Sequence, residues 1–163
     1  LILITSVNLW HGVIWRENLR NVILYIISMC CVGFLEEVIF RGFLFKGMFR
    51  SNGKAAIIVS SLTFGVGHIV NLLTGEPLLE TLLQLVYASA IGFCYTCVFF
   101  TSGSILPCIL SHALVNSTSI FAREPDTGTQ LIVALIQTIL GVSYGLWLLR
   151  KHTEHLTTEK NPL

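Results

Sequence analysis

The chain has 163 residues, of which 53% are hydrophobic and only 12% are charged. A soluble domain carries about 25% charged residues, so this composition argues against a water-soluble globule and indicates a protein of the lipid bilayer. The net charge is +1 and no basic patch with interleaved aromatic residues is present, which argues against nucleic acid as a partner. The fold class that we expect is all-α, a polytopic membrane bundle of about five transmembrane helices.

Apolar runs separated by short polar turns define the predicted elements. Residues 1–21 are an N-terminal tail or the end of an earlier segment, residues 22–150 form the transmembrane domain, and residues 151–163 are a polar C-terminal tail. Glycine favours turns and proline cannot continue a helix, so Gly53, Gly75 and Pro77 mark the ends of predicted helices. The predicted spans cover residues 22–49, 55–73, 78–100, 105–121 and 131–149.

Within the first predicted span, the apolar run over residues 22–45 contains three charged residues, Glu36, Glu37 and Arg41. A charge at the centre of a membrane helix costs about 2.5–3.5 kcal/mol on insertion scales, so each of these charges needs a partner, a wet cavity or a chemical task. Glu37 and Arg41 are four residues apart and share one face of a helix, so we expect them to pair. Glu36 points about 100° away and has no local cation, which leaves it free to react.

Two further polar pairs lie in later spans, each one helical turn apart. Phe64 precedes His68 by four residues, and His112 precedes Asn116 by four residues. A single histidine in a membrane helix is often only a hydrogen-bond partner between helices. Burying these polar groups separately in lipid costs several kcal/mol each, however, so we expect them to converge with the acidic pair in one cavity.

Such a cavity suits hydrolysis of a peptide bond. A carboxylate in a low-dielectric site takes a proton from water more readily than one in bulk solvent, and a neutral imidazole can hold the same water. A second imidazole and an amide can donate hydrogen bonds to the oxyanion of a tetrahedral intermediate. Metal catalysis is the alternative, with Glu36, His68 and His112 as ligands of a zinc ion, although no H-E-x-x-H motif is present. The residues alone leave both mechanisms open.

The three motifs Glu-Glu-x-x-x-Arg, Phe-x-x-x-His and His-x-x-x-Asn, in this order on successive apolar spans, resemble those of the CPBP family. This family includes CAAX-processing endoproteases and proteins linked to bacteriocin maturation and self-immunity. The resemblance covers about residues 22–149, and all three motifs match without substitution. Family members usually have more spans, so the resemblance also implies helices that precede this chain.

The resemblance implies a role for each motif residue. Glu36 would be the general base that activates water, with His68 orienting that water. His112 and Asn116 would form the oxyanion hole, and Glu37 would support the site.

The remaining motif residues have structural tasks under the same resemblance. Arg41 would hold the acidic motif by pairing with it, and Phe64 would pack against the site. The family has often been called a metalloprotease family, but its prenyl-protein members look like glutamate-dependent enzymes without a catalytic metal, which is the mechanism that we favour.

Three functions follow as hypotheses. The first is an intramembrane endopeptidase in the bacterial plasma membrane, acting on a peptide or membrane-protein substrate that is either prenylated, a leader peptide or another membrane protein. The second is a non-proteolytic membrane scaffold or bacteriocin self-immunity protein with the same fold. The third is a transporter or proton relay, which the lack of a two-fold sequence repeat disfavours.

Overall fold

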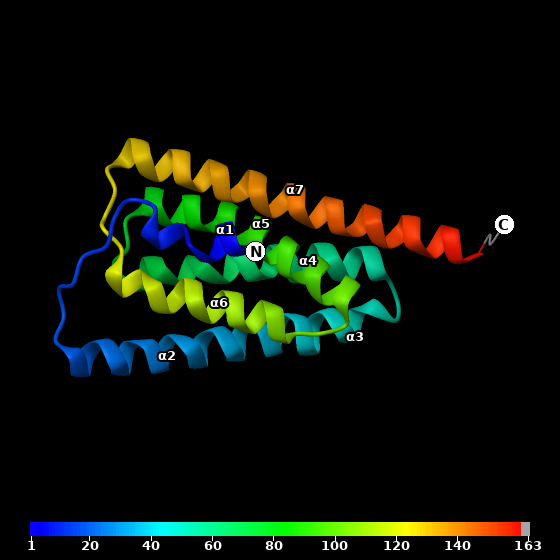
Figure 1. Cartoon of the computed structure of the whole chain (residues 1–163), viewed down its shortest axis with the longest axis horizontal. Helices are drawn as coiled ribbons and strands as arrows, with labels where there is room; N and C mark the ends of the chain where they lie inside the picture. Colours follow the sequence, from blue (N-terminus) through cyan, green and yellow to red (C-terminus); the bar gives the residue numbers. More distant parts are fainter. Residues whose placement is uncertain (161–163) are drawn as a thin grey trace.

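The computed structural model describes residues 1–160, with the side chains of residues 1–154, and it confirms the predicted all-α membrane bundle (Figure 1). An antiparallel bridge between Val13 and Ala122 joins two of its connecting segments. The helices, in chain order, are α1 (Ile2–Thr5), the 3₁₀ helix η1 (Val7–Leu9), α2 (Leu19–Glu37), the π-helix η2 (Val38–Phe45), α3 (Lys46–Phe49), α4 (Gly53–Gly67), the 3₁₀ helix η3 (His68–Thr74), α5 (Leu78–Ser102), α6 (Leu106–Thr118), the 3₁₀ helix η4 (Ser119–Phe121) and α7 (Thr127–Lys160).

Four continuous helical segments of the described chain are long and apolar enough to cross a bilayer: Leu19–Phe49, Gly53–Thr74, Leu78–Ser102 and Thr127–Glu154. They correspond to four of the five predicted spans. The remaining one, predicted for residues 105–121, is an apolar helix at Leu106–Phe121 that is shorter than the other four. Its α-helical and 3₁₀ turns together extend about 25 Å, less than the roughly 30 Å of a hydrocarbon core.

Local capping explains where the helices begin and end. The Asn18 side chain accepts a hydrogen bond from the amide of Asn21, so α2 begins at Leu19, one turn before the predicted start at residue 22. Asn52 caps α4 in the same way, and Gly103 ends α5 with a φ of 69°, a conformation that favours glycine.

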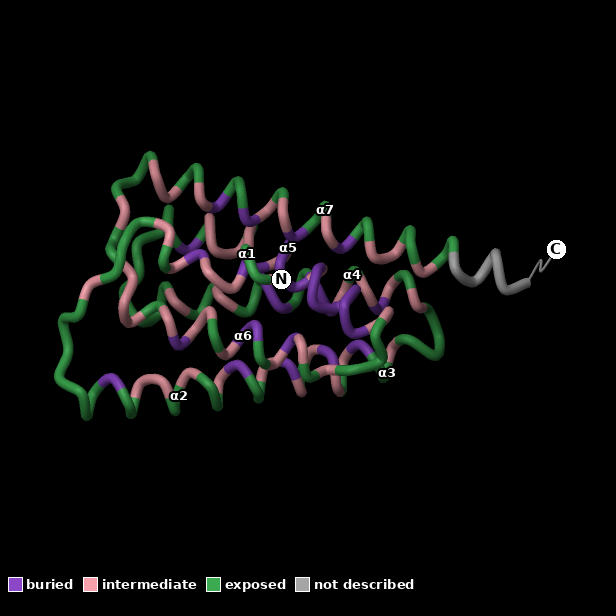
Figure 2. Tube along the Cα trace, in the orientation of Figure 1, coloured by how far each residue is buried: buried purple, intermediate pink, exposed green. Residues whose placement is uncertain are grey.

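Helix α5 occupies the centre of the bundle. It packs against α4 and α7, while α2 packs against α6, and Figure 2 shows the buried segments gathered between the outer helices. Close approach depends on glycine: a Cβ on Gly141 of α7 would lie 2.7 Å from the Ala90 carbonyl oxygen of α5, and a Cβ on Gly33 of α2 would lie 2.9 Å from the Ala113 nitrogen of α6. Small residues therefore set the helix spacing, as is common between membrane helices.

The outward surfaces of the bundle are apolar, whereas its largest fully buried side chains are Arg41, Tyr95 and Glu37. Exposed side chains such as Leu24 on α2 and Ile139 on α7 face the surroundings of the bundle, where the acyl chains of a bilayer would lie. This distribution is the one expected of an integral membrane protein that encloses a polar centre.

Helices extend to both ends of the part of the chain that the structure describes. Near the N-terminus, the Thr5 hydroxyl lies 2.8 Å from the Ser111 hydroxyl, and the Asn8 amide donates to the Val115 carbonyl, so α1 and η1 pack on α6. At the other end, α7 continues through the predicted polar tail as far as Lys160 (Figure 1). The rest of that predicted tail, residues 161–163, lies outside the described residues.

Candidate active site

The acidic motif supplies a buried ion pair. Glu37 and Arg41 are both 0% exposed, and Arg41 Nη1 donates to Glu37 Oε1 at 3.0 Å. Arg41 Nη2 donates to the Gly92 carbonyl of α5 at 2.8 Å, and the guanidinium carbon lies 4.5 Å from the centre of the Phe64 ring and 5.5 Å from that of Tyr95. A carboxylate, a carbonyl and two aromatic faces thus surround the guanidinium and replace part of its lost hydration, while its buried Nε has no hydrogen-bond partner among the described residues.

His112 of α6 lies between the two glutamates. Its Nδ1 is 2.9 Å from Glu37 Oε1, and its Nε2 is 3.7 Å from Glu36 Oε2. A carboxylate oxygen only accepts, so Nδ1 carries the proton of the shorter contact and donates it to Glu37. This hydrogen bond orients the ring and directs Nε2 to the side on which Glu36 lies.

Glu36 differs from Glu37 in its access to solvent. The Glu36 side chain is 32% exposed, and it lines a cleft of about 230 Å³. The other residues that line this cleft come from η2, α4 and η3: Phe40, Phe64, Gly67, His68, Val70 and Asn71. Of the two glutamates, Glu36 is therefore the one that water and a ligand can reach.

His68 begins the 3₁₀ helix η3 and faces the same cleft. Its Nδ1 lies 3.0 Å from the Phe64 carbonyl oxygen, which can only accept, so Nδ1–H donates and the Nε2 of the neutral ring remains an acceptor. The Phe64 ring lies between the two motif histidines, with ring centroids 5.4 Å from that of His68 and 5.4 Å from that of His112.

Asn116 differs from the other polar motif residues in its hydrogen bonding. It follows His112 by one turn on the same face of α6. Within the described part of the chain, its side-chain amide has no hydrogen-bond partner, and only its backbone carbonyl is engaged, accepting from the Ser119 hydroxyl. The structure therefore gathers Glu36, Glu37, Arg41, Phe64, His68 and His112, whereas the Asn116 side chain makes no hydrogen bond to any of these residues.

The three candidate zinc ligands do not fit a metal centre in this arrangement. Among the residues that the structure describes, no group of three or more His, Cys, Asp or Glu side chains is placed to hold a metal ion. Nδ1 of His112 is bound to Glu37 and Nδ1 of His68 is bound to a backbone carbonyl, so each ring could offer an ion only its Nε2. A catalytic zinc needs three protein ligands around one point, and Glu36, His68 and His112 do not supply it.

Several residues around the cluster could not be identified from the sequence. The Tyr95 hydroxyl lies 2.8 Å from the Ser111 hydroxyl, which lies 2.8 Å from that of Thr5. The Tyr95 ring is 6.0 Å from the ring of His112, so this chain of hydroxyl groups begins at a side chain next to the imidazole. Tyr95 occurs in the most apolar predicted span without a polar neighbour at helical spacing, so no pattern in the sequence pointed to it.

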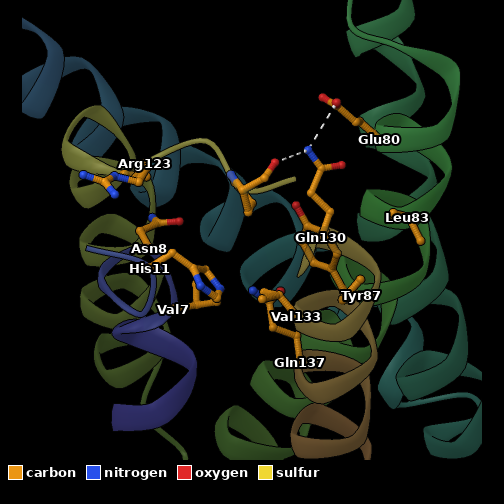
Figure 3. A pocket seen from close by; sticks show the side chains of 13 residues that line it. Val7, Asn8, His11, Glu80, Leu83, Tyr87, Arg123, Gln130, Val133 and Gln137 are labelled. Carbon is orange, nitrogen blue, oxygen red and sulfur yellow. Dashed lines mark hydrogen bonds between the residues drawn. The ribbon is translucent and has the colours of Figure 1, made fainter. Parts of the chain in front are cut away.

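A second cavity of about 220 Å³ lies elsewhere, between the N-terminal segment and the first turns of α5 and α7 (Figure 3). Gln130 Nε2 donates to Glu80 and to the Pro125 carbonyl there, whereas the buried Oε1 of Gln137 has no partner in the described residues. None of the motif residues lines this cavity, whereas Glu36, Phe64 and His68 line the other cleft.

Comparison with known families bears on this arrangement directly. The family described as "Type II CAAX prenyl endopeptidase Rce1-like" matches residues 18–118, more than half of the chain, and this range contains all three motifs. Comparison with curated proteins and with solved structures gives no match. The match confirms the resemblance found from the motifs and supports a protease of the membrane. The chain belongs to the type II CAAX prenyl endopeptidase Rce1-like family.

Proposed function

We propose that the protein is an intramembrane endopeptidase in which Glu36 activates the hydrolytic water. The observation that carries the proposal is the difference between the two glutamates. Glu37 is fully buried and bound by Arg41 and His112, whereas Glu36 faces a cleft that it shares with His68. One carboxylate therefore maintains the structure, and the other remains available for the reaction.

The reaction begins with a water molecule held between the Glu36 carboxylate and Nε2 of His68. Glu36 takes a proton from this water while the water oxygen attacks the carbonyl carbon of the scissile bond. The tetrahedral intermediate then collapses, the C–N bond breaks, and Glu36 returns the proton to the leaving amine nitrogen. The products are a carboxylic acid and an amine, and Glu36 is again a carboxylate.

The oxyanion of the intermediate is stabilised from α6. His112 donates through Nε2–H in its doubly protonated form, with the ring held by its hydrogen bond to Glu37. The Asn116 amide is the second donor, and because it has no partner among the described residues, no existing hydrogen bond must break when the substrate arrives. Removing one such donor typically costs about 2.7–4 kcal/mol of transition-state stabilisation.

A prenylated peptide is the substrate class that we propose. The description of the family names a CAAX prenyl endopeptidase, and the cleft opens beside apolar side chains such as Val70, which is 55% exposed. An isoprenoid chain in the lipid would hold the neighbouring peptide at the depth of this cleft. A leader peptide without a lipid anchor lacks this means of localisation.

The proposal is tested with the protein reconstituted in liposomes and a farnesylated peptide that ends in a CAAX sequence, with products identified by mass spectrometry. Glu36→Gln is expected to lower kcat/KM by about 10²–10⁴-fold, the usual contribution of a general base. Glu17→Gln, which changes an exposed glutamate two residues before α2, is the matched control and should retain full activity. Cleavage by the Glu36→Gln variant at the wild-type rate would refute the mechanism, and a wild-type protein that cleaves neither prenylated nor leader peptides would favour a scaffold or self-immunity protein.

A further inference from the structure

The side chain of Asn71 lies in the cleft with Glu36 and His68, and the mechanism above gives it no task. We propose that Asn71 binds the substrate backbone, with its Oδ1 accepting an N–H group near the scissile bond, and that Gln84 of α5 is the positioning residue behind it. This inference rests on the proposed function, because the contact that it assigns is to the same substrate.

A change of helix type places Asn71 beside His68. Helix α4 ends at Gly67 and the chain continues as the 3₁₀ helix η3 from His68. Residues three apart eclipse one another in a 3₁₀ helix, so His68 and Asn71 project from one face, about 6 Å apart along the axis. In a continuous α-helix, Asn71 would be rotated about 60° from this position.

The hydrogen bonds of Asn71 leave one acceptor available. Its Nδ2 donates to Gln84 Oε1 at 2.7 Å, and its backbone carbonyl accepts from the Glu76 amide and from the Thr74 hydroxyl. The side-chain Oδ1 has no partner among the residues that the structure describes. Because Gln84 holds the nitrogen side of the amide, the orientation of Oδ1 is fixed before any ligand binds.

The substrate backbone supplies the missing donor. A peptide N–H that enters an apolar cleft without an acceptor costs free energy comparable to a lost hydrogen bond. Phe40, Phe64 and Val70 carry no acceptor in their side chains, and the proposed mechanism uses Glu36 and His68 to hold water. Asn71 Oδ1 is the remaining side-chain acceptor of the cleft lining. An extended peptide rises about 3.3 Å per residue, so a donor about two residues from the scissile bond can reach Asn71.

The experiment compares peptide and ester substrates of the reconstituted protein. Replacing one backbone N–H of the farnesylated peptide by an ester oxygen, position by position, removes one donor at a time. Asn71→Ala is expected to raise KM about three- to tenfold with kcat changed less than about threefold, the effect of one neutral hydrogen bond. An ester at one position of the substrate should raise KM of the wild-type protein by a similar factor. In the Asn71→Ala variant, the same ester substrate should have the same KM as the amide substrate.

Two more variants sharpen the result. Gln84→Leu removes the support of the Asn71 amide and should raise KM by a smaller factor, because Asn71 can still bind in part of its rotamers. Asn21→Ala changes an exposed asparagine on α2, outside the cleft, and should leave KM unchanged.

Three outcomes would overturn the inference. The first is an unchanged KM in Asn71→Ala, and the second is that no ester position raises KM of the wild type. The third is that the ester raises KM of Asn71→Ala by the same factor as it raises KM of the wild type. The ester series on the wild-type protein needs no substitution, so a series without effect overturns the inference even where a variant fails to fold. If the wild-type protein cleaves no peptide, the proposed function fails separately, and binding of the amide and ester peptides, followed by fluorescence anisotropy, still tests the contact.

Discussion

Arg41→Met should destabilise the protein strongly, because it removes the cation from a fully buried ion pair. The substitution leaves Glu37 with only the hydrogen bond from His112 and leaves the Gly92 carbonyl without its 2.8 Å donor from Arg41. Removing one partner of a buried pair typically costs about 3–5 kcal/mol, since the remaining charge stays buried. The cation–π contact to Phe64, at 4.5 Å, is lost as well and adds to this cost, so we expect a value within this range and not below it.

The measurement is reversible unfolding in mixed micelles with increasing SDS, followed by tryptophan fluorescence. Glu37→Gln combined with Arg41→Met removes both charges, so the double variant should lose less unfolding free energy than the two single variants lose in total. Arg16→Met is the matched control, because Arg16 pairs with Glu124 at 3.1 Å on the surface, where such pairs contribute at most about 1 kcal/mol. A loss of less than about 1 kcal/mol in Arg41→Met would refute the assignment of a structural role to this pair.

Two further substitutions test the packing and the capping of the bundle. Gly33→Ala should cost about 1–3 kcal/mol in the same SDS unfolding assay, because the new Cβ would lie 2.9 Å from the Ala113 nitrogen and force α2 away from α6. Gly47→Ala is the control and should cost much less, since no atom lies within 4 Å of its new Cβ. Equal costs for the two variants would contradict this account. The pKa of Asp126 is lowered by hydrogen bonds from the hydroxyl and the amide of Thr129, so this carboxylate stabilises the folded state above its unfolded pKa, and the contribution is lost as the pH falls through the lower folded pKa. Asp126→Ala should therefore lower the unfolding temperature at pH 7 and reduce the fall of that temperature between pH 7 and acidic pH. A fall identical to that of the wild type would show that the hydrogen bonds of the Asp126 carboxylate do not contribute to stability.

Much of the site geometry follows from helical spacing alone. The four-residue interval between Glu37 and Arg41 predicts their ion pair, and the structure has it at 3.0 Å. The same reasoning gives Glu36 no local cation, and the ring nitrogen that lies 3.7 Å from its carboxylate comes from another helix, at His112. Spacing could not predict which glutamate His112 would bind, because that depends on the approach of α2 to α6 at Gly33.

The less predictable parts are those where the helix type changes. The sequence pattern indicates one continuous span over residues 55–73, yet the chain passes from α4 into a 3₁₀ helix at His68. Likewise, the π-helix that begins at Val38 directly follows the acidic pair, and apolar periodicity has no feature that identifies it. The contact of Asn71 with Gln84 is visible only once these local geometries are known.

The limited length of α6 has a consequence for the surrounding lipid. A helix that spans less than the hydrocarbon thickness draws the two leaflets together around it, at a cost of a fraction of a kcal/mol per ångström. Helix α6 carries His112, so this depression of the membrane would lie beside the proposed active site. Bulk water would then need to cross only a short apolar barrier, and a lipid-tethered chain at the headgroup level would already lie near the depth of the proposed hydrolysis.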